Sequence, residues 1–442
     1  MHIPGIRAPE VCAFLQEVPG ILDRLSRHEE CKMAIDVDDS ETVHYLHFKP
    51  KEFWEASGKA ELADKNLPRP NFFPIVSSVL LAQAMLKRAT GEGPTRGIQG
   101  FIIEFPTAGG HNAPPRGFRY DAVAKSHSLS LNEKGEPIYG PKDDVDLVKF
   151  KAASKGLPFY LAGYYARPEK LQEVLALGGA GVQVGTSFAF ASESGLSDSA
   201  KQEVLSRIAN NDLTVYTDPV ASPTGFPFKV LELDGSLSEK EKYAERPRVC
   251  NLGYLRTAYE KDGKIGYRCA AEPIDDWLKK GGDIQATEGR KCLCNGLMAN
   301  AGIPQVPFSP PPVRPPSALT RHFPRCTWCV VLTFSESGLQ VSPHKAKGSD
   351  ERYVEETLIT AGDDVNQVRK YMKQDANGRW EYSARDVVDY LLGKFKDEYL
   401  NELKLYKDAD AAEDPKVKDA LKAEKAKIEK KVADVDEQLA KK

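Results

Sequence analysis

Short apolar runs alternate with segments of helical periodicity between Leu67 and Asp218. The runs predict strands at Phe72–Val76, Gly100–Phe105, Leu157–Ala162, Ala180–Val184 and Leu213–Thr217. The intervening segments predict helices over Val79–Leu86, over Pro168–Leu177, and after Ser199, where Gln202 completes a capping box. Because strands that alternate with helices favour parallel βα units, this region predicts an α/β fold.

The flanking regions show different patterns. Residues 1–66 predict an irregular N-terminal segment, and 67–230 form the βα region. Residues 231–393 predict a turn-rich and helical extension that a proline-rich insert at 306–350 interrupts. From residue 394 to 442 Lys, Glu, Asp and Ala predominate, with apolar residues at helical spacing. This pattern predicts a charged amphipathic helical tail, either a coiled-coil arm or a solvated single helix.

Composition narrows the class of protein. The 442 residues carry a formal charge of −3, so no strong basic field indicates nucleic-acid binding. The chain has no apolar run long enough to span a membrane and no signal-peptide pattern at its N-terminus. Eight cysteines in a chain of this length do not make a disulfide scaffold. We therefore expect a protein of a reducing compartment, the cytoplasm, with no nucleic-acid or membrane partner.

Three predicted strands end in glycine-containing loops, which is where parallel βα folds carry their chemistry. The loops are Thr107–Gly117, Ala162–Tyr165 and Gly185–Phe188. Gly109 and Gly110 would let the backbone approach a flat ligand, and His111 beside them could exchange a proton near neutral pH. The amides of the other two loops, with the Thr186 hydroxyl, could hold a phosphate. Each loop alone is more typical of a tight turn. The order and spacing of the three loops together favour a functional site.

These segments also carry a resemblance to a known family. Gly100–Gly117, Leu157–Leu196 and Thr217–Val230 resemble nitronate monooxygenases, and the likeness continues through Gly289–Asn300 and Leu358–Asp364. The resemblance implies an FMN-dependent (β/α)8 TIM barrel that oxidises alkyl nitronates or nitroalkanes with O2 to a carbonyl compound and nitrite. It covers residues 20–305 and 351–393 approximately.

The resemblance assigns roles to individual residues. His111 takes the position of the family's active-site histidine. Ala108, Gly109 and Gly110 would lie along the flavin, and Gly163, Gly185 and Thr186 would hold the FMN phosphate. The implied partners are a small nitro compound and O2, and no metal is expected.

Three departures from the family pattern limit what the resemblance implies. The early βα units are missing, so we expect a barrel that is incomplete at its N-terminus, binds FMN poorly and self-associates through its open edges or its tail. Tyr164 stands where the family has a second glycine, and residues 306–350 interrupt the pattern. Two alternatives stay open: a flavin-dependent enoyl reductase, and a non-catalytic remnant that no longer binds FMN.

Several other features are weaker. His322, Cys326 and Cys329 resemble part of a zinc site, although we expect incidental cysteines there. Cys292 and Cys294 are expected to be packed thiols. Arg116 could bind an anionic substrate or form a loop salt bridge. The aromatic residues Phe48, Phe53 and Trp54 are expected in the core.

Overall fold

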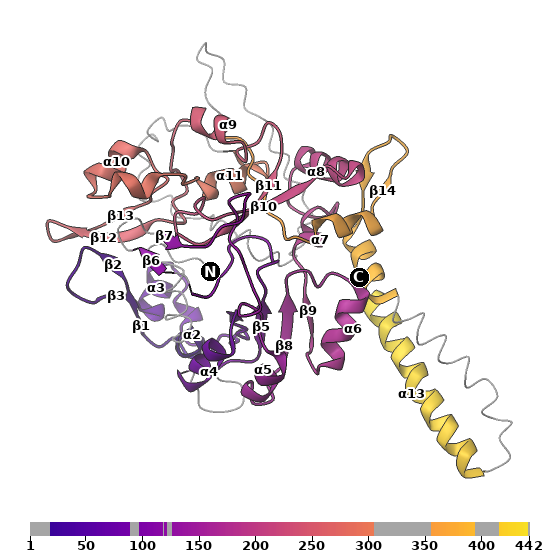
Figure 1. Ribbon diagram of the computed structural model, residues 1–442. Coiled ribbons are helices and arrows are strands. Elements are labelled where there is room, and N and C mark those ends of the chain that lie inside the picture. Colours follow the sequence, from indigo (N-terminus) through magenta and orange to yellow (C-terminus); the bar gives the residue numbers. More distant parts are fainter. Residues whose placement is uncertain are drawn as a thin grey trace.

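A computed structural model describes residues 18–88, 97–117, 119–121, 126–304, 355–393 and 415–440 (Figure 1). The helices are α2 (Val18–Ser26), α3 (Pro50–Ala56), α4 (Val79–Arg88), α5 (Leu147–Ala153), α6 (Pro168–Ala176), α7 (Thr186–Ala189), α8 (Asp198–Asn210), α9 (Lys240–Glu245), α10 (Ile274–Lys279), α11 (Leu293–Ala299) and α13 (Pro415–Ala440), with 3₁₀ turns η1 (Ala60–Leu62), η2 (Ile284–Thr287) and η4 (Val365–Lys370). The strands are β1 (Cys31–Ile35), β2 (Val37–Asp38), β3 (His44–Phe48), β4 (Ile75–Val76), β5 (Phe101–Glu104), β6 (Arg119–Asp121), β7 (Ser126–Ser128), β8 (Phe159–Ala162), β9 (Gly181–Gln183), β10 (Thr214–Asp218), β11 (Phe228–Glu232), β12 (Thr257–Lys261), β13 (Lys264–Arg268), β14 (Lys373–Gln374) and β15 (Trp380–Glu381).

A four-stranded parallel sheet in the order β4-β5-β8-β9 forms the centre of the βα region. Its strands follow one another in the sequence, and helices α4, α5 and α6 lie between them in the chain. The prediction of an α/β fold with parallel βα units is therefore confirmed. The described strands do not close into a barrel: β4 and β9 each have one neighbour in this sheet.

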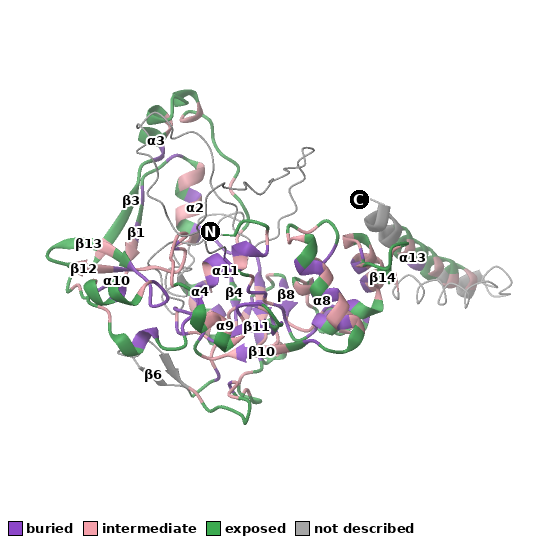
Figure 2. Ribbon diagram, turned by 90° about the horizontal axis from the view of Figure 1, so that it is seen from above, coloured by how far each residue is buried: buried purple, intermediate pink, exposed green. Residues whose placement is uncertain are grey.

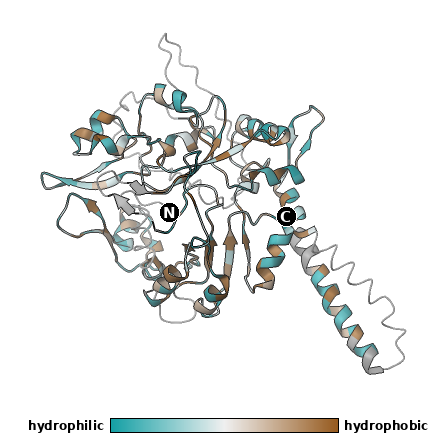
Figure 3. Ribbon diagram, viewed as in Figure 1, coloured by the Kyte–Doolittle hydropathy of each residue, from teal (hydrophilic) through white to brown (hydrophobic). Residues whose placement is uncertain are grey.

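The two faces of the sheet differ in burial. One face carries Val76, Ile103 and Leu161, which pack with Phe150 of α5 and Val174 of α6 into a core of fully buried side chains. The strands appear brown and the helices mixed in Figure 3, as expected when helices cover one sheet face. Local signals position two of these helices, since the Asp146 side chain caps α5 and Pro168 opens α6.

A second core lies beside the sheet, where α8 packs against β10, β11 and residues 359–391. Strand β10 was expected to extend the parallel series, but it pairs antiparallel with β11. Helix α8 also begins differently from the prediction. Ser197, not Ser199, is its N-cap, and the Ser197 hydroxyl accepts from the Ala200 amide at 3.3 Å.

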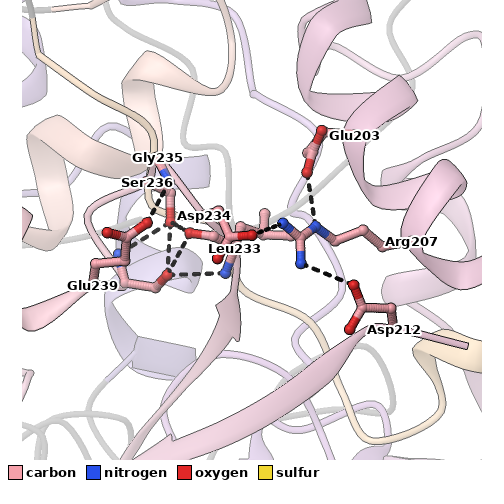
Figure 4. A network of polar contacts seen from close by, with 9 residues as sticks. Glu203, Arg207, Asp212, Leu233, Asp234, Gly235, Ser236 and Glu239 are labelled. Atoms are coloured by element: carbon pink, nitrogen blue, oxygen red, sulfur yellow. Dashed lines mark hydrogen bonds and ion pairs between the residues drawn. The ribbon is translucent and has the colours of Figure 1, made fainter.

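An ion-pair network fastens the C-terminal end of α8 (Figure 4). The guanidinium of Arg207 contacts Glu203 at 2.8 Å, Asp212 at 3.4 Å and Asp234 at 2.6 Å. Asp234 lies in the turn after β11, so the network joins helix and hairpin. Its carboxylates are largely exposed, and solvent therefore weakens the contribution of each pair to stability.

Residues 18–66 are more regular than the sequence predicts. Strands β1 and β3 pair antiparallel, and β2 pairs parallel with β12 of the extension to form a sheet in the order β13-β12-β2. The expected burial of the aromatic cluster was wrong for two of its members. Phe48 and Phe53 are 42% and 43% exposed, with ring centroids 5.6 Å apart. Most residues of β3 and α3, the elements that carry these rings, are exposed (Figure 2).

The predicted tail helix is present as α13, which extends away from the body in both views (Figures 1 and 2). Ile428 on this helix is buried. The proline-rich insert, including His322, Cys326 and Cys329, lies outside the described residues. Among the residues that the structure describes, no helix is both long and apolar enough to cross a membrane.

Candidate functional site

The carboxyl ends of β5, β8 and β9 lie side by side because these strands are parallel neighbours. This arrangement brings the predicted loops together. A Cβ added to Gly163 would lie 2.8 Å from the Thr107 hydroxyl oxygen and 2.9 Å from the Ala108 amide nitrogen. Gly163 also has a φ of +93°, which favours glycine. The loop after β8 therefore packs directly on the loop after β5.

A later segment, residues 357–364, crosses these strand ends. It runs beside β11, where the Leu231 amide donates to the Ile359 carbonyl at 2.9 Å. At the strand ends, the Gly110 amide donates to the Thr360 hydroxyl at 2.8 Å, and the Gly362 amide donates to the Thr186 hydroxyl at 2.9 Å. We call residues 357–364 the crossing segment.

The crossing segment fills the space that the glycines create. A Cβ on Gly109 would lie 2.7 Å from the carbonyl carbon of Ala361 and 2.8 Å from the amide nitrogen of Gly362. A Cβ on Gly362 would lie 2.9 Å from the Thr107 carbonyl oxygen. Real Cβ atoms do not approach backbone so closely, so Gly109 and Gly362 permit contact between two stretches of protein backbone.

His111 follows these glycines and pairs with Phe228 of β11 in an isolated antiparallel bridge. Its Nε2 lies 2.6 Å from the hydroxyl oxygen of Ser222, which is fully buried. The Ser222 hydroxyl also lies 2.8 Å from the Thr224 hydroxyl. The imidazole and the Phe228 ring are arranged edge to face, with their centroids 4.9 Å apart. The histidine therefore has a defined orientation at the strand end.

A buried cation anchors the crossing segment to the hairpin. Lys229 on β11 is buried, and its Nζ lies 2.8 Å from Asp363 and 2.8 Å from the Thr217 hydroxyl. The Lys229 amide donates to the Gly110 carbonyl at 2.9 Å. One residue thus holds both the histidine loop and the crossing segment.

Two carboxyl groups near the strand ends were missed by sequence reasoning. Glu104 ends β5, and burial raises its pKa to about 7. Burial likewise raises the pKa of Asp364 to about 6. A carboxyl that titrates near neutral pH can take up or release a proton there. The sequence did carry a signal for Glu104, because an acidic residue directly follows the apolar run Phe101–Ile103. We interpreted Glu104 only as part of the strand.

Tyr164 adopts a φ of +64°, the left-handed conformation that costs energy for a residue with a Cβ. The Arg167 guanidinium lies 4.1 Å from the centroid of its ring. Tyr164 therefore has a backbone conformation that is typical of glycine, and its ring lies against the Arg167 guanidinium.

The other residues predicted to bind FMN differ in whether protein atoms cover them. Gly185 is exposed, with nothing within 4 Å of the position of an added Cβ, whereas Thr186 uses its hydroxyl on the crossing segment. Of the three residues implied to hold the FMN phosphate, Gly185 is exposed and Gly163 and Thr186 are half-buried. The face of Gly109 that would lie along the flavin ring is covered by Ala361 and Gly362, so these residues do not fit the ring in this arrangement.

Other sequence-predicted positions have structural partners. The Arg116 guanidinium donates to the Ser77 carbonyl at 2.9 Å, and its amide donates to Asp143 at 2.6 Å. Cys292 is buried as predicted, while Cys294 is half-buried. No group of three or more histidine, cysteine or acidic side chains could hold a metal ion in the part of the chain that the structure describes.

Comparison with known proteins gives limited likeness. No protein-family profile matches the chain, and no curated protein matches it. Among solved structures, FabK from Thermotoga maritima is 22% identical, with a TM-score of 0.24, over 39% of this chain and 41% of that one. Nitroalkane oxidase from Streptomyces ansochromogenes is 19% identical, with a TM-score of 0.25, over 40% of this chain and 42% of that one. The chain thus matches less than half the length of these weak structural neighbours.

Proposed function

We propose that this chain acts on alkyl nitronates and nitroalkanes as an FMN-dependent oxidoreductase, with His111 as its catalytic residue. The observation that supports the proposal is the placement of His111 at the carboxyl end of a parallel strand. Ser222 holds its imidazole at 2.6 Å. Loops at this end of parallel βα folds carry catalytic side chains.

His111 would accept the α-proton of a neutral nitroalkane. The Ser222 hydroxyl has one O–H and two lone pairs, so it can donate to a bare Nε2 or accept from Nε2–H, and its oxygen also lies 2.8 Å from the Thr224 hydroxyl. The ring is therefore held both before and after it gains a proton. Bound FMN would supply the electron acceptor, but the covered face of Gly109 does not fit its ring, and we assign no electron-transfer step to these residues.

A second candidate is a chain of the same ancestry that does not bind FMN. The close backbone contact of Gly109 with Ala361 and Gly362 favours it, because the glycine gap is already filled by protein. Under this candidate the glycines are retained for packing, and His111 has a structural role beside Phe228.

Flavin binding separates the two candidates. The full chain is dialysed against excess FMN, and the bound flavin is measured by its visible absorbance. One flavin per chain supports the oxidoreductase, and absence of bound flavin at saturating FMN supports the second candidate. Oxidation of NAD(P)H by an enoyl thioester, without O2 uptake on nitronate, would instead indicate an enoyl reductase.

The role of His111 is tested with His111→Ala on the flavin-loaded protein. Oxygen uptake with a neutral nitroalkane should fall by about 10²- to 10⁴-fold, the usual contribution of a general base. Uptake with the preformed nitronate should fall less, because it needs no deprotonation. Ser222→Ala is the matched variant, since it removes the orienting hydroxyl and keeps the imidazole. Equal turnover of the nitroalkane by wild type and His111→Ala would remove His111 from the mechanism.

A further inference from the structure

A cluster of thiols lies in the extension, away from the strand ends. Cys269 follows β13 directly, and Cys292 precedes α11. These two residues form a small core with Ala271, and Cys250 packs against it. Three segments that are distant in sequence therefore bring their thiols together.

Cys250 and Cys269 differ in access to solvent. Cys250 is half-buried, whereas Cys269 is 7% exposed. The two side chains pack in the same cluster, and their interaction lowers the pKa of Cys250 and raises that of Cys269. Cys250 is therefore the more exposed residue of the two, and Cys269 is the buried one.

The charges around the pair favour a thiolate at Cys250. The Nη2 of Arg256 donates to the Cys250 carbonyl at 2.7 Å, and its guanidinium also hydrogen-bonds to the Cys250 side chain. The carboxylate of Glu272 opposes this effect but is paired with Lys280 at 2.8 Å. The Cys269 hydrogen bond and the Arg256 guanidinium together lower the pKa of Cys250 to about 6.

The neighbouring thiols have the opposite environment. Burial raises the pKa of Cys292 to about 11 and that of Cys294 to about 12. Since the thiolate is the nucleophile, these two cysteines should react slowly at neutral pH. They provide internal controls within the same cluster.

We propose that Cys250 and Cys269 are a redox pair, in which hydrogen peroxide oxidises Cys250 and Cys269 then closes a disulfide with it. The combination of a half-buried cysteine, an arginine on its carbonyl and a second thiol packed in the same cluster carries this inference. Redox-sensing cysteines are typically accessible thiolates beside a resolving cysteine.

The chemistry balances in two steps. The Cys250 thiolate attacks one peroxide oxygen, the O–O bond breaks, and hydroxide leaves to become water, so that Cys250 becomes a sulfenic acid. The Cys269 sulfur then attacks the Cys250 sulfur. The S–S bond forms, the S–O bond breaks, and a second water carries away the Cys269 proton. Two thiols and one peroxide give one disulfide and two waters, and a thiol reductant reverses the change.

The test uses the full chain in reduced form at pH 7. Dilute hydrogen peroxide is added, free thiols are alkylated, and tryptic peptides are analysed by mass spectrometry. Trypsin separates the two cysteines because Arg256 and Arg268 lie between them. We expect a linked peptide pair joining Cys250 to Cys269, which dithiothreitol removes, while Cys292 and Cys294 stay alkylated.

Variants distinguish the roles of the two thiols. Cys269→Ser should leave Cys250 as a sulfenic acid that dimedone traps, and Cys250→Ser should abolish the fast reaction. Arg256→Met should slow oxidation of Cys250 by about tenfold at pH 5 but only by about twofold at pH 7, if it raises the pKa of about 6 by one unit, because Cys250 is already mostly thiolate at pH 7. Cys294→Ser is the matched control and should react as wild type does.

Three outcomes would overturn the proposal. The first is oxidation of Cys292 or Cys294 at the rate of Cys250. The second is an unreactive Cys250 in wild type with a cooperative thermal transition, which shows that the protein is folded. The third is one equivalent of metal, copurified with the reduced chain and held by these thiols against alkylation.

Discussion

The two faces of the central parallel sheet are buried to different extents. On one face, Ile103 and Leu161 are fully buried beneath helices. On the opposite face, the side chains of Ile102, Glu104 and Tyr160 are half-buried, and Ile75 of β4 is 45% exposed. In a closed barrel both faces of every strand are covered. The helix-covered face therefore buries its apolar side chains more completely, whereas the other face keeps partial access to solvent and carries the carboxyl group of Glu104.

Adjacent isoleucines on β5 give the largest contrast. Ile103→Ala should lower the free energy of unfolding by about 2–5 kcal/mol, because it leaves a cavity in the packed core. Ile102→Ala, on the opposite face, should cost much less, because its side chain is only half-buried. Urea unfolding of both variants measures the difference. Equal losses would mean that the two faces are equally buried in solution.

Glu104 sharpens the comparison through pH. Its folded pKa of about 7 lies above the ordinary value of 4.5, so the folded state binds the extra proton between these values. Stability contributed by the protonated carboxyl is full below pH 4.5 and is lost as pH rises through 7. Glu104→Gln should therefore unfold with less pH dependence, and at pH 8 it should be more stable than wild type by up to about 3 kcal/mol.

Urea unfolding of Glu104→Gln and wild type at pH 4.5, 6 and 8 gives this measurement. Glu136→Gln is the control. Glu136 lies in the loop after β7, where its carboxylate accepts from the Thr217 amide at 3.0 Å, and the side-chain oxygen of glutamine can accept the same hydrogen bond. A wild-type stability that rises between pH 4.5 and 7 relative to Glu104→Gln would contradict a buried, protonated carboxyl.

Gly109 tests the contact that covers the strand ends. Gly109→Ala would place a methyl group 2.7 Å from the Ala361 carbonyl carbon, so it should cost about 1–3 kcal/mol through overpacking. Gly185→Ala, at an open position, serves as the control and should change stability by less than about 1 kcal/mol. If both variants unfold alike by thermal denaturation, the crossing segment does not pack on Gly109 in solution.

Tyr164 provides the smallest expected effect. Tyr164→Gly relieves the left-handed backbone conformation and should raise the free energy of unfolding by about 0.5–1 kcal/mol. Loss of the contact with Arg167 offsets part of this gain. Tyr164→Ala keeps the Cβ and should not show this gain. A stability of Tyr164→Gly below that of Tyr164→Ala would show that strain at this residue is negligible.

Local patterns identified much of the sheet and its helices. Strands β5, β8 and β9 and helices α4 and α6 were predicted close to their observed bounds, because apolar alternation, Pro168 and the glycines after each strand act over a few residues. The pairing of β10 with β11 was not predicted, since a short apolar run does not specify its partner strand. The N-cap of α8 shifted by two residues within a run of competing serines.

The candidate site was only partly predictable for a related reason. The sequence places His111 after two glycines, but nothing local indicates that Ser222, 111 positions later, would meet its imidazole. The glycine loops were interpreted as space for a ligand, whereas Gly109 meets backbone of the crossing segment. Contacts between distant segments depend on tertiary packing, and a local pattern of apolar and polar residues does not predict which segments meet.

The crossing segment also fixes the order in which this chain can fold. The hydrogen bond from Gly110 to Thr360 joins residues 250 positions apart. At a synthesis rate of about 5–20 residues per second, the β5 loop would wait roughly 12–50 s on the ribosome before its covering partner is made. The sheet can form in that interval, but its strand ends stay exposed to chaperones and proteases until the last fifth of the chain emerges.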